Sequence, residues 1–214
     1  MALFKGKKRG DLLRAAADTN PAAGMREAAE GISARDALSL FYFLMAVDGT
    51  LHDDEFEKFD AIYRELGGAD HINQKVLIHE CQAKLDASVS SDNPLISALT
   101  CVDEVLYKPS VHDHRDVVVP PRLLVWDLLT IACSDGNCHS SERDLIKHIA
   151  SIVGVEDSLV LEMESFILTL LDLENEETWI KTTSQPYLVI ESVLKDIEAR
   201  KTAVFDGVKA LITQ

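Results

Sequence analysis

Residues 45–55 read MAVDGTLHDDE, and residues 133–142, CSDGNCHSSE, repeat the same skeleton. In both stretches Asp-Gly is followed after two residues by His, and after two more by Glu. Each stretch lies between two segments in which apolar residues recur at the three-and-four spacing of a helix. The sequence therefore predicts two similar helix-turn-helix corners, and the fold depends on how they are related.

The repetition extends beyond the motif, because residues 35–67 align with residues 122–154 without a gap. Several of the identities fall within the motif itself, which favours a common origin over chance. Repeats of this kind usually pack about a pseudo-twofold axis, since each covers an apolar face that one copy alone cannot bury. The identical pairs are Arg35/Arg122, Asp48/Asp135, Gly49/Gly136, His52/His139, Glu55/Glu142, Ile62/Ile149 and Gly67/Gly154.

Helical spacing continues along most of the chain, and the only β-branched cluster, at residues 117–119, runs directly into two prolines. We therefore expect an all-α fold of two pseudo-symmetric four-helix repeats, at about 34–107 and 121–200, packed into one domain. A loop is expected at about 174–185. The predicted helices are 34–47, 53–66 with a stop at Gly67-Gly68, 71–85, 94–108, one opening at Pro121, 140–153, 157–171, and one beginning at Pro186.

The overall charge limits the classes of partner. With 36 acidic and 21 basic residues the chain has a formal charge of -15, which argues against nucleic acid as a ligand. Cations and basic protein surfaces suit it better. The segment 156–177 is especially acidic, and we interpret it as an amphipathic helix packed on the core, with docking of a protein partner as the alternative.

The first thirty residues form a basic N-terminal segment, for which we expect a solvated terminus. Peripheral contact with an anionic membrane is the alternative, although the basic residues are too few for stable anchoring. Neither a spanning run of about 20 apolar residues nor an export signal is recognisable, so a cytoplasmic location is expected. Its basic residues are concentrated in the first fourteen positions, as Lys5, Lys7, Lys8, Arg9 and Arg14.

Each motif matches the second half of an EF-hand calcium loop, in which Asp, Gly and Glu hold places five, six and twelve. Places one and three would be Leu44 and Ala46 in the first copy, and Ile131 and Cys133 in the second. These side chains offer no oxygen ligands, so neither loop can form a full calcium cage.

What remains at each corner is a carboxylate at a helix end, an imidazole, and a second carboxylate in the next helix. A pseudo-twofold arrangement would bring the two corners together into a fuller divalent-ion site. A set of mixed oxygen and nitrogen ligands favours Zn²⁺ or Mn²⁺ over Ca²⁺. The candidate ligands are Asp48, His52, Glu55, Asp135, His139 and Glu142.

The alternative is that the corners are helix caps only. A Glu three residues after the N-cap supplies half of a capping box, and acids in a first turn are favoured by the helix dipole. His52 and His139 stand where such a box prefers Ser, Thr, Asp or Asn. Capping and ion binding are compatible with each other, and both remain open.

The segments AVDGTLHDDEFEKFDAIYRELGG (46–68) and CSDGNCHSSERDLIKHIASIVGVE (133–156) resemble the two signature segments of the TerB family of tellurite resistance proteins. The related domain of DjlA co-chaperones has a similar pattern. The resemblance implies an all-α fold of two repeats, and acidic positions that bind a metal ion. It also implies a noncatalytic role in resistance to tellurite and other stresses, in the cytoplasm or at the membrane periphery.

Carried over to this chain, the resemblance marks Asp48, Glu55, Asp135 and Glu142 as metal ligands. The two histidines depart from the family pattern, which leaves Zn, Mn and Ca as candidate ions. The resemblance places a TerB-like domain at residues 31–172. Residues 173–214 would form a C-terminal helical extension that completes the second repeat.

Two further groups have metal-ligand spacing. Cys133, Cys138 and His139 form C-x(4)-C-H, but Ala46 and Leu51 replace the thiols in the first copy, so we interpret the cysteines as filling small apolar positions. His112 and His114 lie in a polar connection, where a solvated loop is expected. No nucleophile-and-base motif is recognisable, so we do not predict an enzyme, and a hydrolase using metal-bound water has only the carboxylates to support it.

Overall fold

Helices dominate the computed structural model of the chain, which describes residues 11–12, 14–15, 31–49, 51–66, 72–88, 93–107, 117–134, 136–184 and 187–213. A mostly helical fold is thus confirmed. Within these ranges there are eight helices and a two-stranded sheet. The helices are α2 (Ala34–Met45), α3 (Asp53–Glu65), α4 (Gln74–Ala87), α5 (Pro94–Tyr107), α6 (Pro121–Ala132), α7 (Ser140–Ile152), α8 (Asp157–Thr182) and α9 (Tyr187–Thr213).

Helices α2 and α6 form the centre of the core and pack against each other. Every residue of α2 except Arg35 is buried, and so is every residue of α6 from Leu123 onward. A helix that is covered on all sides has to be apolar around its circumference, as these two sequences are. The paired helices therefore position the segments that follow them, which are the two predicted corners.

A short antiparallel ladder aligns the starts of the two central helices. Strand β1 (Ile32–Ser33) pairs with β2 (Val118–Val119), and Ile32 lies opposite Val119. The backbone N–H of Ala34 adds a bond to the carbonyl of Val117 at 2.9 Å. The β-branched cluster at residues 117–119 thus forms a small strand, and its pairing fixes the register between α2 and α6.

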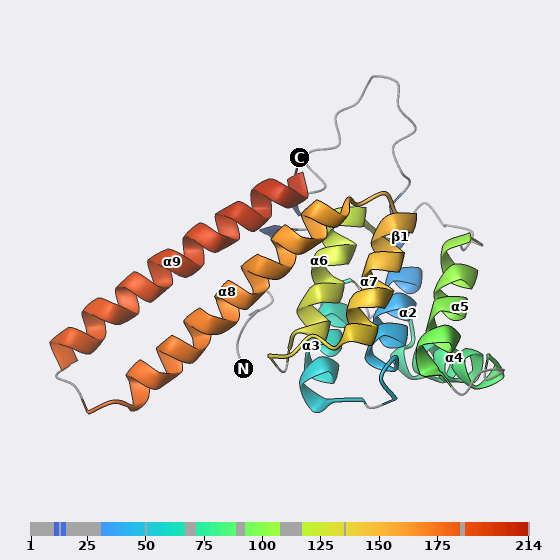
Figure 1. The fold of residues 1–214 in the computed structure, drawn as a ribbon, viewed down its shortest axis with the longest axis horizontal. Coiled ribbons are helices and arrows are strands. Elements are labelled where there is room, and N and C mark those ends of the chain that lie inside the picture. The colour runs from blue at the N-terminus through green and yellow to red at the C-terminus, as the bar shows by residue number, and fades with distance from the viewer. Residues whose placement is uncertain are drawn as a thin grey trace, which may run out of the picture.

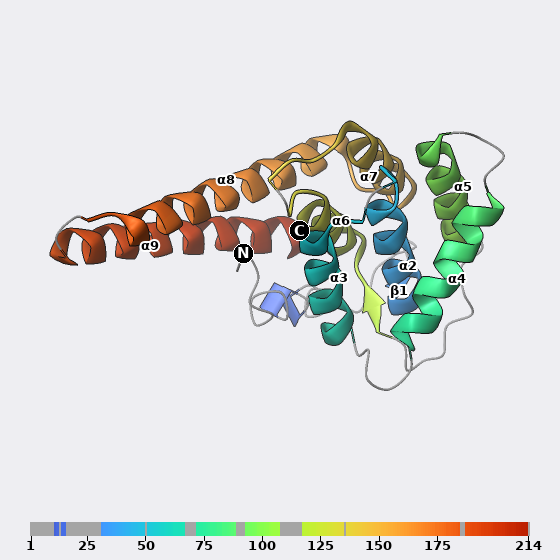
Figure 2. The same ribbon diagram turned by 90° about the horizontal axis from the view of Figure 1, so that it is seen from below.

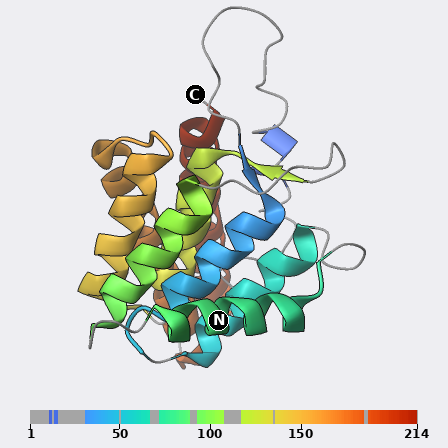
Figure 3. The ribbon, with the colours of Figure 1, turned by 90° about the vertical axis from the view of Figure 1, so that its right-hand side faces the viewer.

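The remaining helices cover this pair from different sides (Figure 1). Helix α3 packs against both α2 and α6, and α7 packs against α6 and α5. Helices α4 and α5 cover α2 on the side of the molecule that faces the viewer in Figure 3. The connections α2–α3 and α6–α7 lie at the same end of the bundle (Figure 1).

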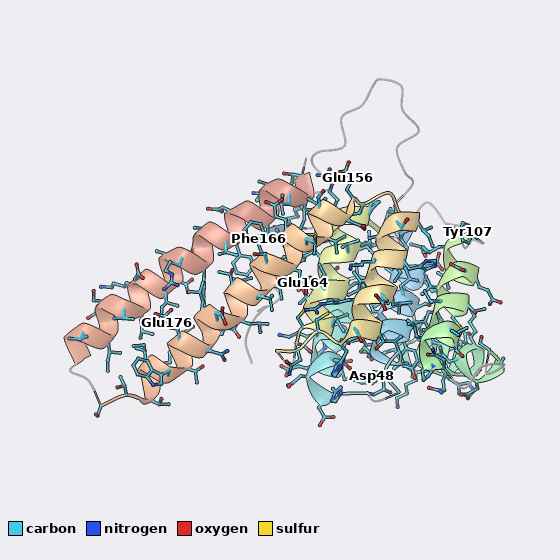
Figure 4. All side chains as sticks on the ribbon, viewed as in Figure 1. Asp48, Tyr107, Glu156, Glu164, Phe166 and Glu176 are labelled. Atoms are coloured by element: carbon cyan, nitrogen blue, oxygen red, sulfur yellow. The ribbon has the colours of Figure 1, made fainter. Side chains whose placement is uncertain are left out.

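Helices α8 and α9 form a long antiparallel hairpin that extends away from the bundle (Figures 1 and 2). Gly207 allows close approach, because a Cβ there would lie 2.9 Å from the ring of Phe166, which Figure 4 shows on α8. The end of α9 returns to the bundle, where Arg122 Nη1 donates to the carbonyl of Leu211 at 2.8 Å. The end of α9 is therefore tied to the bundle.

The expectation of a loop at about 174–185 is wrong, because α8 continues through Thr182. Acidic residues in its last turns are paired with basic residues of α9. Arg200 Nη1 donates to Glu176 Oε2 at 3.0 Å, and Glu177 forms ion pairs with Lys201 of α9 and with Lys181 of α8 itself. These pairs add to the packing of α8 against α9 in a segment whose own apolar pattern is weak.

Several expectations concern residues outside the described ranges. They are the basic residues Lys5 to Arg9, the helix stop at Gly67-Gly68, the helix start at His71, the pair His112 and His114, and Pro186. Within the described ranges, no helix combines the length and apolarity that a crossing of the bilayer would require.

Candidate functional site

The two predicted corners have the same backbone turn. Gly49 follows α2 with a φ of 82°, and Gly136 follows α6 with a φ of 93°. In each corner the glycine N–H donates to the carbonyl three residues earlier, that of Ala46 or Cys133, at 3.1 Å. Positive φ is a region that glycine enters at little cost and most L-residues avoid. The repeated glycine is thus required by the turn itself.

The glutamates of the two corners cap the helices in which they lie. The backbone N–H of His52 donates to Glu55 Oε2 at 3.2 Å, and that of His139 donates to Glu142 Oε2 at 2.7 Å. Each Glu occupies the third position of its helix and bonds back to the N-cap residue, as a capping box requires. The capping role predicted for both glutamates is confirmed.

Unlike most capping glutamates, these two are buried and in contact. Glu55 is 5% exposed and Glu142 is 2% exposed, and their side chains hydrogen-bond to each other. A bond between two carboxyl groups requires a proton on one of them. The glutamates that end the two motifs therefore meet inside the bundle. A shared ion site between the two corners would need this contact.

Burial is the main cause of the altered ionisation of this pair. It raises the pKa of Glu142 to about 9, and the electrostatic effects of Cys138 and Glu55 act in the same direction. Burial also raises the pKa of Glu55, although the bonds from the His52 N–H and from Glu142 oppose the shift. The pair therefore holds a proton at neutral pH, as the hydrogen bond between the two carboxyl groups requires.

Asp48 and His52 lie beside the pair at the first corner, which Figure 4 marks by Asp48. His52 Nε2 is 3.7 Å from Asp48 Oδ2, and both residues affect the pKa of Glu55. At the second corner His139 is exposed, and its backbone N–H donates to Glu142. Asp135 lies outside the described residues.

The donor chemistry of the corners suits a divalent cation in part. Two buried carboxyl groups in contact, and the Asp48 carboxylate and His52 imidazole of the first corner, are groups of the kinds that bind Ca²⁺, Mn²⁺ or Zn²⁺. Among the residues that the structure describes, however, no three His, Cys, Asp or Glu side chains gather closely enough for a complete ion site. The described part of the site is therefore a bridging pair, Glu55 and Glu142.

The two cysteines of the second corner do not merely fill apolar positions. Cys133 is buried and Cys138 half-buried, and their thiols hydrogen-bond to each other. This bond and burial raise the pKa of Cys133, whereas the same bond, together with Arg143, lowers the pKa of Cys138. The Cys spacing was visible in the sequence, but the approach of Arg143, one residue after the motif, was not.

A small hollow lies between α3 and α6, next to the buried residues Lys58 and Asp127. Its volume of about 20 Å³ would hold a water molecule, but it is far smaller than the sites that bind organic ligands. Burial lowers the pKa of Lys58, and Glu174 of α8 opposes the shift. We interpret this polar cluster as part of the interface between α3 and α6.

Comparison with known protein families identifies a matching family model, described as "Tellurite resistance protein TerB", over residues 34–163. The matched range begins with α2, includes both corners, and ends within the first turns of α8. Searches of the curated proteins and of the solved structures found no match.

Proposed function

The chain belongs to the TerB family of tellurite resistance proteins, and on this premise we propose that it is a noncatalytic resistance protein that binds a divalent cation between Glu55 and Glu142. The observation that carries the proposal is the direct contact between these two buried carboxyl groups. The proposed setting is the cytoplasm, in the response to tellurite and related stress.

The first argument is the cost of burying carboxylates. A carboxylate that leaves water is destabilised unless a proton, a cation or several hydrogen bonds compensate for its charge. Here each Glu receives one backbone N–H bond, from His52 or His139, and the two share a proton. A divalent cation would replace that proton and neutralise both carboxylates, which would then bridge the ion.

The second argument is the set of donors around the pair. Asp48 and His52 already act on Glu55, and the aligned Asp135 and His139 are the corresponding candidates at the second corner. Mainly carboxylate ligands favour Ca²⁺ or Mn²⁺, whereas participation of imidazole would favour Zn²⁺ or Mn²⁺. Mn²⁺ is compatible with both sets and is the first ion to test.

We also propose that the bundle is an internal duplication, with repeats at about 34–107 and 121–200. The identical turns at Gly49 and Gly136 and the identical caps by Glu55 and Glu142 support it. The duplication would explain why one chain carries the motif twice: each copy contributes one carboxylate to a shared ion.

A second candidate is a metal-independent interaction module, in which the corners are caps only. It is supported by apolar side chains that α8 exposes along one line, Leu161, Leu168 and Trp179, of which Trp179 is 66% exposed. These positions are separated by nearly whole numbers of helical turns, so they share one face. A basic partner would complement the acidic residues of the same helix.

Equilibrium titration of the tag-free protein with Mn²⁺, Ca²⁺ and Zn²⁺ tests the proposal. We expect saturable binding of one ion per chain, which Glu55→Gln/Glu142→Gln abolishes although it keeps the size and hydrogen-bonding capacity of both side chains. Glu191→Gln is the matched control, because Glu191 is a partly exposed residue of α9 that pairs with Lys195, far from both corners in the sequence. If the double variant binds as the wild type does, the interaction module is favoured.

A further inference from the structure

Cys133 and Cys138 form a pair of thiols at the second corner that the proposed cation site does not use. Cys133 ends α6, and Cys138 directly precedes His139, the N-cap residue of α7. The Gly136 N–H closes the turn between them by donating to the Cys133 carbonyl at 3.1 Å. The turn brings the two thiols into hydrogen-bond contact.

We propose that this dithiol binds a thiophilic oxyacid of a heavy element, with tellurite as the ligand that the family favours. The choice of tellurite rests on the proposed function, whereas the dithiol itself is a feature of this chain. Two adjacent thiols can chelate one such atom, because both bonds form within a single preorganised site.

The proposed step is a condensation without electron transfer. Each thiol replaces one hydroxyl group on the central atom, so a sulfur bond to that atom forms, a bond from it to oxygen breaks, and the thiol proton leaves in water. Two thiols and one oxyacid thus give one bis-thiolate adduct and two water molecules. The half-buried Cys138 is the point of entry, and the buried Cys133 closes the chelate.

Arg143 and Glu164 determine the charge at this site. The Arg143 guanidinium contacts the Cys138 thiol and pairs with Glu164 Oε1, with Nη2 at 2.7 Å. Figure 4 shows Glu164 on α8. Arg143 can donate to an oxygen that stays on the bound atom, and Glu164 holds the guanidinium in place beside the thiols.

The other two cysteines have different surroundings. Cys101 Sγ lies 3.3 Å from Ser88 Oγ, and Cys81 bonds to Ser39, so each contacts a hydroxyl group and not a second thiol. At the first corner, Ala46 and Leu51 replace the two cysteines of the second. We therefore expect one adduct per chain.

Intact-protein mass spectrometry of the reduced full chain, after exposure to tellurite and in parallel to arsenite, tests the proposal. We expect one adduct per chain with the mass of a condensation product. Leu123–Arg143 is a single tryptic peptide that contains both cysteines and no other, so peptide mapping locates the adduct without a variant. An adduct with either reagent supports the dithiol site, and the reagent that forms it identifies the element.

Variants separate this site from the proposed cation site. Cys133→Ala introduces the residue that the first corner carries as Ala46, and it should prevent the chelate, while Cys81→Ala/Cys101→Ala should retain it. Glu55→Gln/Glu142→Gln should also retain it, so failure of the cation site would leave this result unchanged. The proposal is overturned if neither reagent forms an adduct, or if the product is a disulfide that lacks the element.

Discussion

The side chains of Glu55 and Glu142, which lie 87 residues apart in the sequence (142 − 55), hydrogen-bond to each other inside the helical bundle. Each also caps its own helix, so the pair links the start of α3 to the start of α7. A single contact thus joins the two copies of the repeated motif, and its ionisation couples stability to pH and to cation binding.

The first prediction concerns the pH dependence of stability in the metal-depleted protein. Glu142 has a pKa of about 9 when folded, against 4.5 when unfolded. Between these values the folded chain holds the extra proton, so the free energy of unfolding should fall as pH rises from about 5 to 9. One proton corresponds to about 1.4 kcal/mol per pH unit at most.

Urea denaturation across this range, with EDTA present, measures the effect. Other groups titrate in the same range, so the comparison is between wild type and Glu142→Gln, which cannot lose a proton. The difference between the two proteins should grow with pH in favour of Gln. Parallel pH profiles would show that Glu142 does not hold the proton.

The second prediction separates the stability that Glu142 contributes as a helix cap from the effect of its ionisable group. Glu142→Ala removes the acceptor of the His139 N–H and leaves Glu55 without its partner, so it should lower the free energy of unfolding by about 1–3 kcal/mol at pH 7. Glu142→Gln keeps an acceptor oxygen and should lose less. If both variants are equally unstable, the cap contributes little.

The third prediction concerns the repeated turn. At both Gly49 and Gly136 an added Cβ would have nothing within 4 Å, so the cost of a side chain comes from the positive φ alone. Gly49→Ala should therefore destabilise the protein by about 1 kcal/mol. Gly49→Asn should cost less, because Asn tolerates left-handed backbone. If the two variants lose equal stability in thermal denaturation, the cost comes from a steric contact of the new side chain and not from the positive φ.

The fourth prediction concerns the protons released on cation binding. Near pH 7.5 the glutamate pair holds one proton, because Glu142 ionises only at about 9. Binding of Mn²⁺ to both carboxylates should displace about one proton. Calorimetric titration in two buffers with different ionisation enthalpies counts the protons released. A count near zero would mean that the ion binds without displacing the shared proton.

The parts of the fold that could be predicted are those encoded by apolar spacing within a single helix. The apolar spacing of Leu38, Phe41 and Leu44 predicted α2, and the aligned spacing predicted α6. The extension of α8 to Thr182 was missed because it depends on packing against α9, where Leu173 and Ile197 are buried, and periodicity within one helix cannot reveal a partner helix. The ladder between β1 and β2 is too short to give a strand pattern of its own.

The candidate site could also be predicted only in part, because the motif is visible in the sequence whereas the burial of its side chains is not. The repeat identified Glu55 and Glu142 and implied that they approach each other. Their burial was not predictable, because a Glu at this helical position normally faces solvent while it caps. In the sequence, His139 and His52 were equivalent candidate ligands at aligned positions. The structure exposes His139, and no sequence signal distinguished the two.

The most direct test of the proposed cation site is anomalous diffraction from crystals of the full chain grown with Mn²⁺. The predicted result is a peak within bonding distance, about 2.1–2.3 Å, of carboxylate oxygens from both Glu55 and Glu142. The contradictory result is a pair of glutamates that remain hydrogen-bonded to each other at saturating Mn²⁺, with the anomalous signal elsewhere or absent.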